Sequence, residues 1–241
     1  MTGFPGGTAV SIVSVYDWPT ADGQAGGTPH FHTASTEGYV VTGGTGAVET
    51  LSGDGYERRD LARGTVLWFT PGTVHRLVNL SGDLQLVVVM SNAGIPEAGD
   101  AVFTFPDEVL HDPEAYDAAA TAPAAPGLTD AERGEATRAR RDLAVEGYLA
   151  LRERVLQEGA DAMRPVWDRA ARIVADRTET WRKLWAGGPK AQADATGDHL
   201  DALARAESAH LCDAHVGSAG DAVGKWGMCG RLETWDLRPH S

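Results

Sequence analysis

Short apolar runs separated by turn residues fill the first 105 positions, and their pattern predicts β-strands. β-Branched and aromatic residues gather in these runs, whereas glycine, aspartate and serine occupy the gaps between them. Many short strands joined by tight turns are typical of an all-β barrel or sandwich. The predicted strands cover residues 9–16, 37–41, 46–51, 65–69, 74–80 and 84–90. Positions 86–90 are apolar without alternation, so we expect the last strand to be buried on both faces.

From about residue 106 the spacing of apolar residues becomes helical. Pro106 and Pro113 each stand before acidic residues, an arrangement typical of the first turn of a helix. Residues 121–127 are rich in alanine and proline and indicate a linker. Apolar residues then recur at helical spacing from 166 to 185, and Gly187-Gly188-Pro189 is expected to end that helix.

Another helix is predicted over residues 198–216, and the glycine-rich residues 217–241 predict no element. Leu200, Leu203 and Leu211 are expected on the inner face of this helix. For Trp167, Trp181 and Trp185 three packing partners stay open: a small helical bundle, the barrel or a second subunit. The fold class is therefore a mainly β N-terminal barrel followed by an α-helical C-terminal region. The expected divisions are 1–105 for the barrel, 106–128 for short helices and a linker, and 129–241 for the α-helical region.

Charge excludes two classes of partner. The formal net charge is −13, and residues 1–120 contain four arginines, no lysine and 15 acids. Nucleic-acid phosphates and anionic membranes both attract clustered lysine and arginine, so neither is an expected partner. No apolar run is long enough to span a bilayer, and the N-terminus lacks the pattern of a secretory signal. We therefore expect a cytoplasmic protein whose two cysteines, Cys212 and Cys229, are thiols.

Three histidines and a glutamate in the β part form a pattern that suits a metal. His30-Phe31-His32 lies in an extended context, where alternation puts both imidazoles on one face and Phe31 on the other. Glu37 follows five residues later, and His75 lies two hairpins further on. Three imidazoles and a carboxylate suit one divalent first-row metal. If the ion is six-coordinate, two positions stay open for substrate, water or O₂, as in a catalytic site.

The spacing of these residues resembles the two conserved motifs of the cupin superfamily. In this chain the motifs are His30-x-His32-x4-Glu37-x6-Gly44 and Gly64-x7-Gly72-x2-His75-x3-Asn79. Two departures occur: Pro71 is shifted by one position, and the glycine expected six residues before the first histidine is absent. The resemblance covers roughly residues 9–90. It implies a jelly-roll barrel in which the two histidines of the first motif, its glutamate and the histidine of the second hold the metal, while the three motif glycines form turns.

The resemblance also implies an activity. The single-barrel size and the aliphatic strand after the second motif are similar to bacterial quercetinase-like dioxygenases, which is an analogy at the level of the fold. It implies a metal-dependent oxygenase whose small, partly apolar substrate coordinates the metal. Glu37 would stay a ligand or act as general base. Iron is the first choice of metal, with nickel, manganese, copper or zinc as alternatives, and O₂ is the expected co-substrate. The candidate substrate-lining residues are Tyr39, Trp68, Phe69 and Leu77. Family habit implies a homodimer.

Two other functions stay open at this point. In the first, the metal acts as a Lewis acid in an isomerase, lyase or cyclase. In the second, the barrel is a non-catalytic module that binds a small molecule, and the helices form its output or dimerisation surface. A further alternative is that the helices close over the mouth of the barrel as a lid.

The helical part contains two weaker metal-like patterns. Glu207-x-x-His210 matches half of a di-iron helical motif, but no second copy follows in that part, so we interpret it as a solvated polar face. His199, His210, Cys212 and His215 form a loose cluster without a standard zinc spacing. Neither pattern is expected to hold a metal.

Overall fold

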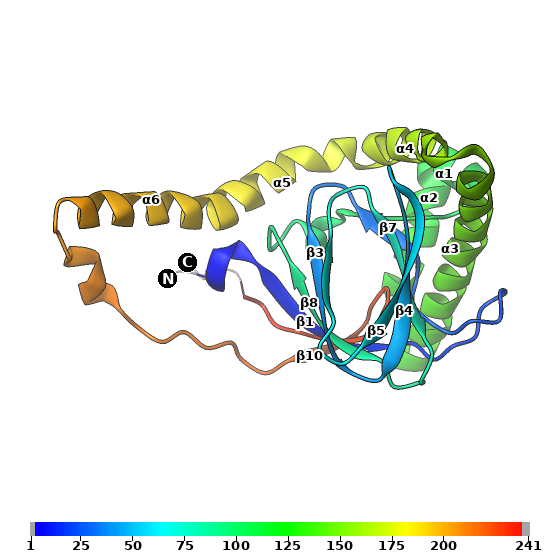
Figure 1. Cartoon of the computed structure of the whole chain (residues 1–241), viewed down its shortest axis with the longest axis horizontal. Helices are drawn as coiled ribbons and strands as arrows, with labels where there is room; N and C mark the ends of the chain where they lie inside the picture. The colour runs from blue at the N-terminus through cyan, green and yellow to red at the C-terminus, as the bar shows by residue number, and fades with distance from the viewer. Residues whose placement is uncertain (1–2, 238–241) are drawn as a thin grey trace.

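The computed structural model describes residues 3–237 and contains a β-barrel of two antiparallel sheets with helices along one side (Figure 1). The first sheet has the order β10 (Val223–Trp226), β11 (Gly230–Thr234), β1 (Ala9–Val15), β8 (Gln85–Met90), β3 (Glu37–Gly43) and β6 (Val66–Phe69). The second has the order β5 (Gly55–Ala62), β4 (Thr45–Ser52), β7 (Val74–Asn79), β2 (His30–His32) and β9 (Ala101–Phe103). The mainly β first half is thus confirmed.

Alternation along the strands fills the barrel. On β3, Tyr39 and Val41 are buried while Val40 between them faces outward. The residues that share the interior core with these two are Val13, Val15, Val48, Leu61, Phe69, Leu77, Leu84, Leu86, Val88, Met90 and Cys229. On β8, Val87 and Val89 are only half-buried, so the expected burial of residues 86–90 on both faces holds only in part.

Six α-helices lie between β9 and β10 in the described residues. They are α1 (Asp107–His111), α2 (Pro113–Thr121), α3 (Asp130–Glu158), α4 (Arg164–Val174), α5 (Thr178–Trp185) and α6 (Ala191–Ala204). Pro113 occupies the first turn of α2, as its sequence predicts. Thr129 begins α3 with a capping box, because its hydroxyl accepts from the Glu132 amide and the Glu132 carboxylate accepts from the Thr129 amide.

Helix α3 covers the outer face of the five-stranded sheet. Its buried stripe, Ala144, Tyr148, Leu151 and Val155, recurs at helical spacing and shares a second core with strand residues such as Phe31. Gly147 lets the helix approach the chain after β9 closely, because a Cβ there would lie 2.2 Å from the Thr104 carbonyl oxygen. The barrel therefore has an apolar interior and, on one side, an apolar exterior that the helices bury.

A buried ionic network joins the same two layers. Arg76 is fully buried on the outer side of β7, where its guanidinium donates to Asp22 at 2.7 Å. Glu49 on β4 lies 3.5 Å from Arg76 and accepts from the Tyr148 hydroxyl of α3 at 3.1 Å. A buried charge is tolerated only when it is paired in this way.

The C-terminal quarter differs from the prediction in two respects. The expected α-helical region 129–241 does not continue to the end of the chain, because β10 and β11 add to the first sheet through pairing of β11 with β1. The helix expected to stop at Gly187-Gly188-Pro189 instead continues through a π-helical turn, η6 (Ala186–Lys190), into α6. A π-turn accommodates Pro189 because it changes the pattern of backbone hydrogen bonds around the missing amide. The division of the chain into domains stays a prediction.

The leucines of the last helix are also placed differently. Leu200, Leu203 and Leu211 were expected on an inner face, but they are 63%, 51% and 58% exposed. They lie on a projecting segment of α6 and the 3₁₀-helix η7 (Ala209–Asp213), which contacts little of the barrel. Both cysteines are free thiols, as expected. Within residues 3–237, none of the helices combines the length and the apolar character that a membrane crossing needs.

Candidate metal centre

The four predicted ligands meet inside the barrel, close to one of its ends. His30 and His32 come from β2, Glu37 begins β3, and His75 lies on β7 directly opposite His30 in the strand pairing. One ligand atom from each of the four residues lies within 4.8 Å of every other, and all four side chains are buried. The alternation that places both imidazoles of the His30-Phe31-His32 segment on one face also places Phe31 in the outer core.

The ring nitrogens are oriented for a metal. Nδ1 of His30 lies 2.8 Å from the carbonyl oxygen of Thr28, and Nδ1 of His75 lies 3.0 Å from that of Thr73. A carbonyl oxygen only accepts, so each Nδ1 carries the proton and each Nε2 presents a lone pair. The two Nε2 atoms lie 3.2 Å apart and face the same point.

Glu37 completes the group with a carboxylate. Its Oε2 lies 2.9 Å from Nε2 of His75 and 3.2 Å from Nε2 of His32. Burial alone would raise the pKa of Glu37, but the neighbouring His75 and His32 hold it well below its usual value. The carboxylate is therefore charged at neutral pH. Three imidazole nitrogens, each neutral or carrying a proton that a metal would displace, and one carboxylate oxygen match the ligand preferences of a divalent first-row ion. The residues present therefore fit the metal.

His32 has an acidic partner that the sequence did not reveal. Asp100, which precedes β9, is fully buried and places Oδ2 3.3 Å from Nδ1 of His32. Burial would lower the pKa of His32, but Asp100 and Glu37 together raise it to about 9. The Asp100 carboxylate also accepts from the backbone amides of Thr33, Ala34 and Ser35, which fix its position. Such outer partners orient metal-binding histidines.

Aromatic side chains form the wall beside the ligands. The Phe69 ring stacks on His75 with centroids 4.6 Å apart, and the Tyr39 ring lies edge-on to His75 at 6.2 Å. Tyr39, Phe69 and Leu77 all belong to the core inside the barrel. Their contact with a substrate stays a prediction.

Trp68 does not line the barrel, contrary to the prediction. Its side chain is 70% exposed on the outer side of β6, because neighbouring residues of a strand face opposite ways and Phe69 occupies the inner position. Phe69 pairs with Glu37 across β6 and β3, and this register decides that Phe69 faces the interior and Trp68 the outside.

The turn between β10 and β11 brings a second unpredicted residue into the interior. Cys229 is buried beside Tyr39, whose hydroxyl has no hydrogen-bond partner of normal geometry among residues 3–237. Burial raises the pKa of Tyr39 well above its usual value, and the charge of Glu37 adds to the shift. Burial likewise raises the pKa of the Cys229 thiol. Both groups therefore keep their protons at neutral pH, next to the metal ligands.

Helices α4 and α5 contact loops at the metal end of the barrel. The indole of Trp167 donates to the carbonyl oxygen of Gly72 at 2.9 Å, three residues before His75. On α5, the indole of Trp181 donates to the carbonyl oxygen of Ala98 at 3.0 Å, and Arg177, on the 3₁₀-turn η5 (Ala175–Arg177) between the two helices, donates to that of Gly99 at 2.7 Å, next to Asp100. These helices thus support the two loops that precede a ligand and its partner.

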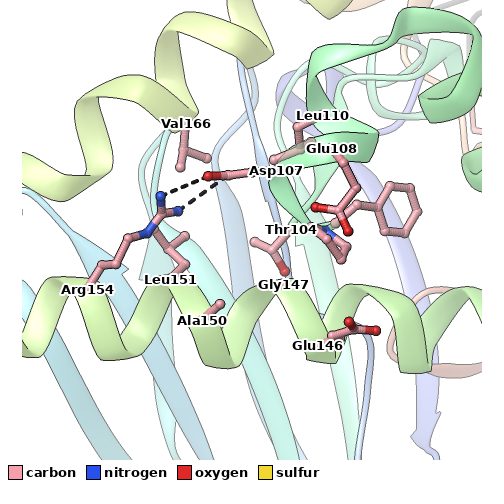
Figure 2. Close-up of a pocket in the computed structure, with 12 residues that line it drawn as sticks. Thr104, Asp107, Glu108, Leu110, Glu146, Gly147, Ala150, Leu151, Arg154 and Val166 are labelled. Carbon is pink, nitrogen blue, oxygen red and sulfur yellow. Dashed lines mark hydrogen bonds and ion pairs between the residues drawn. The ribbon is translucent and has the colours of Figure 1, made fainter.

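A separate cavity lies outside the barrel. It has a volume of about 380 Å³ and opens between α1, α3 and α4, where Asp107 pairs with Arg154 (Figure 2). None of the four ligands lines it. The cavity is therefore distinct from the metal centre.

The weaker metal-like patterns remain without a shared site. Although the rings of His199 and His210 stack with centroids 4.4 Å apart, His30, His32, Glu37 and His75 are the only group of three or more metal-type ligands found in residues 3–237. Cys229 is buried in the barrel core, whereas Cys212 is exposed.

Comparison with protein families decides the class of the barrel. Residues 20–92 match the Cupin domain family, and this match includes all four ligands. This part of the chain is a cupin domain. The comparison with curated proteins finds no match.

The solved structures that are similar to this chain match only part of it and only part of their own length. A double-stranded β-helix protein from Klebsiella pneumoniae is 19% identical, with 35% of this chain and 66% of that chain covered and a TM-score of 0.29. WlaRA, a TDP-fucose-3,4-ketoisomerase from Campylobacter jejuni, is 16% identical over 38% and 64% of the two chains, with a TM-score of 0.31. The nucleoside dehydratase Pac13 from Streptomyces is 20% identical over 35% and 58%, with a TM-score of 0.27. The matched part spans less than two thirds of each, so these similarities say nothing about the reaction of this cupin.

Proposed function

We propose that the cupin domain binds one divalent transition metal through His30, His32, Glu37 and His75 and is the catalytic domain of a metal-dependent enzyme. One observation carries the proposal. Four ligand atoms converge within 4.8 Å in a buried site, while the Nδ1 atoms of His30 and His75 are already bound to backbone carbonyl oxygens. A set of polar side chains buried for packing alone would not leave three nitrogens and a carboxylate facing one point without another partner.

The substrate that suits this site is a small, partly apolar molecule with an oxygen donor. Bound with three neutral imidazoles and one carboxylate, a divalent ion would keep a formal charge of about +1 and supply a point of attachment for an anionic substrate oxygen. Phe69 and Tyr39 provide the apolar wall that would hold the rest of the molecule and exclude water. Glu37 is the only carboxylate among the ligands, and in this proposal it accepts the substrate proton.

Oxidation of this substrate with O₂ is the reaction we favour, with iron as the metal. Both the burial of the ligands and the apolar core around them support it, because a water-excluding site protects reactive species from side reactions. Three imidazoles also suit iron, nickel or copper.

Elemental analysis of freshly purified protein tests the metal centre. The wild type is compared with His75→Ala and with His111→Ala, a control histidine that lies exposed at the end of α1. We expect about one redox-active metal per chain in the wild type and in the control, and loss of that metal in His75→Ala. Circular dichroism of all three proteins checks that the fold is kept. A metal content that is equal in the two variants would refute the site.

A second reaction class has an observation in its favour. Tyr39 and Cys229 carry protons beside Glu37, as a non-redox isomerase, lyase or cyclase that uses the metal as a Lewis acid would need. Stoichiometric zinc, and turnover that continues under anaerobic conditions, would select this class. Consumption of O₂ with a candidate substrate would select the oxygenase. Tight binding of a small molecule without turnover in either atmosphere would instead identify a binding module.

A further inference from the structure

A second cavity outside the barrel lies beside the first three turns of α3. It has a volume of about 390 Å³ and opens between α3, the 3₁₀-turn η3 (Ala122–Ala124) and β10, which the chain reaches by passing beneath the barrel (Figure 1). None of the four metal ligands lines it. Small-molecule sites occupy cavities of roughly 300–1,000 Å³, so this one is large enough for a ligand of its own.

Positive charge dominates the walls of this cavity, although the chain as a whole is acidic. Among the lining residues that the structure describes, the cationic ones are Arg133, Arg140 and Lys225, and the one carboxylate is that of Asp130. This carboxylate accepts from the Trp226 indole at 2.8 Å and lies 3.7 Å from Arg231. The lining residues thus have a formal charge of +2 in a chain whose net charge is −13.

The neighbouring acids do not offset this charge. The Glu132 carboxylate accepts from a backbone amide at the start of α3 and does not line the cavity. Glu135 is two residues from Arg133, and helix residues at this spacing do not face each other. Glu233 and Arg231 stand two residues apart on β11, so they share one face of that strand and offset each other. The excess positive charge therefore remains at the cavity.

Neither arginine of the cavity is neutralised within the described part of the chain. No carboxylate among residues 3–237 forms an ion pair with Arg133 or Arg140. Arg140 is half-buried, and burial lowers its pKa. Burial would also lower the pKa of Arg76, but its hydrogen bonds to Asp22 raise it. A charge held out of water without an ionic partner is costly, so Arg140 is a group that an anionic ligand would stabilise.

Backbone carbonyl oxygens hold the two guanidinium groups in place. The accepting oxygens are those of Pro123 and Leu128 for Arg133, and those of Ala120 and Gly227 for Arg140. Ala120 and Pro123 are three residues apart, about one turn, where α2 passes into η3, so both arginines reach the same short stretch of chain. A guanidinium has five N–H donors, so each group keeps donors for a ligand. Groups that are fixed beforehand lower the ordering cost of binding.

We propose that this cavity binds a small organic phosphate monoester, whose phosphate group lies between Arg133 and Arg140. A phosphate monoester has a charge close to −2 at neutral pH and three terminal oxygens. It therefore matches the charge of the walls and can accept from both guanidinium groups at once, whereas a single carboxylate is satisfied by the fork of one arginine. Pro123, Ala124 and Trp226 offer an apolar side for the organic part.

Calorimetric titration of the full-length protein tests the class of ligand. The probes are phenyl phosphate, inorganic phosphate and benzenesulfonate, which resembles phenyl phosphate in shape but has a single negative charge. We expect one phenyl phosphate to bind per chain, more weakly at high salt. The other two probes should bind at least about tenfold more weakly, because inorganic phosphate lacks the apolar part and benzenesulfonate lacks the second charge. Absence of phenyl phosphate binding, or equal binding of benzenesulfonate, would overturn the proposal. Equal binding of inorganic phosphate would overturn its organic part.

Substitutions on α3 test the location of the site. Arg133→Gln should weaken the binding of phenyl phosphate at least about tenfold, because it removes a charged group of hydrogen-bond donors. Arg138→Gln changes an exposed arginine of the same helix outside the cavity and should bind like the wild type. Arg140→Lys keeps the charge of a half-buried side chain but loses the fork, so it should weaken binding as well. Melting curves show that each variant is folded.

His75→Ala separates this cavity from the metal centre, to which a phosphate would also bind. The variant should bind phenyl phosphate as tightly as the wild type, because His75 does not line the cavity. Loss of binding in His75→Ala, or wild-type affinity in Arg133→Gln, would contradict the proposed location.

Discussion

The carboxylate of Asp100 lies 3.3 Å from Nδ1 of His32, on the side of the ring opposite Glu37, which lies 3.2 Å from Nε2. Three backbone amides hold this carboxylate in place, so its negative charge stays beside the ring. In the sequence the two residues are separated by 68 positions.

We predict that Asp100→Asn weakens metal binding by about 10–100-fold, the usual effect of removing an outer partner of a metal-binding histidine. The variant keeps the size of the side chain but loses the negative charge beside His32. Competition with a chelator measures the affinity. Asp60→Asn, on the exposed side of β5, serves as the control and should bind metal like the wild type. Equal affinities in the two variants would show that Asp100 does not act on the centre.

Gly147→Ala is expected to destabilise the protein by about 2–3 kcal/mol, despite the gain of about 1 kcal/mol in helix propensity. A Cβ at this position would lie 2.2 Å from the Thr104 carbonyl oxygen and force α3 away from the sheet. Urea unfolding measures the loss. Gly53→Ala, where a Cβ would meet no atom within 4 Å, should change the free energy of unfolding by less than about 0.5 kcal/mol. If the two variants are equally stable, the close approach of α3 to the Thr104 carbonyl oxygen does not contribute to the stability of the fold.

Trp167→Phe should lower the free energy of unfolding by about 1 kcal/mol, because it removes the hydrogen bond from the indole to the Gly72 carbonyl oxygen. The substitution keeps an aromatic ring against the loop, so its effect reports mainly the hydrogen bond. Trp68→Phe removes an exposed indole and should leave stability unchanged. Equal unfolding curves for the two variants would mean that the hydrogen bond contributes nothing.

The ion pair between Asp22 and Arg76 predicts how stability depends on pH. Burial opposes ionisation of Asp22, but the hydrogen bonds from Arg76 and Thr20 hold its pKa well below the usual value. A lowered folded-state pKa contributes stability that is present above the unfolded pKa of about 3.9 and is lost as the pH falls towards the folded pKa.

Unfolding of the wild type should therefore become easier between about pH 5 and pH 2, more steeply than unfolding of Asp22→Asn. Stability of both proteins at several pH values, measured with urea, checks the slope. Asp54→Asn, in the exposed turn between β4 and β5, should keep the slope of the wild type. Parallel curves for the wild type and Asp22→Asn would contradict this role of the ion pair.

Local spacing in the sequence was sufficient to predict that the four candidate metal ligands come together and which strands carry them. His30 and His32 share a face because any extended segment alternates, whatever lies around it. The same is true of the start of α2, where Pro113 needs no partner from elsewhere to favour the first turn of a helix. Such features depend on a few neighbouring residues, so they can be inferred before the fold is known.

Only the tertiary structure decided which face of each element is buried and what it meets. Trp68 and Phe69 are equally apolar, and the pairing of β6 with β3 alone turns Phe69 inward and Trp68 outward. Asp100 and Cys229 reach the centre because β9 and the C-terminal strands return to sheets whose ligands stand far earlier in the chain. Leu200 has helical spacing like any core leucine, yet it lies exposed because no element within residues 3–237 covers its side of α6. Periodicity reports the local backbone, whereas burial depends on surfaces contributed by distant segments, and these are brought together only by folding.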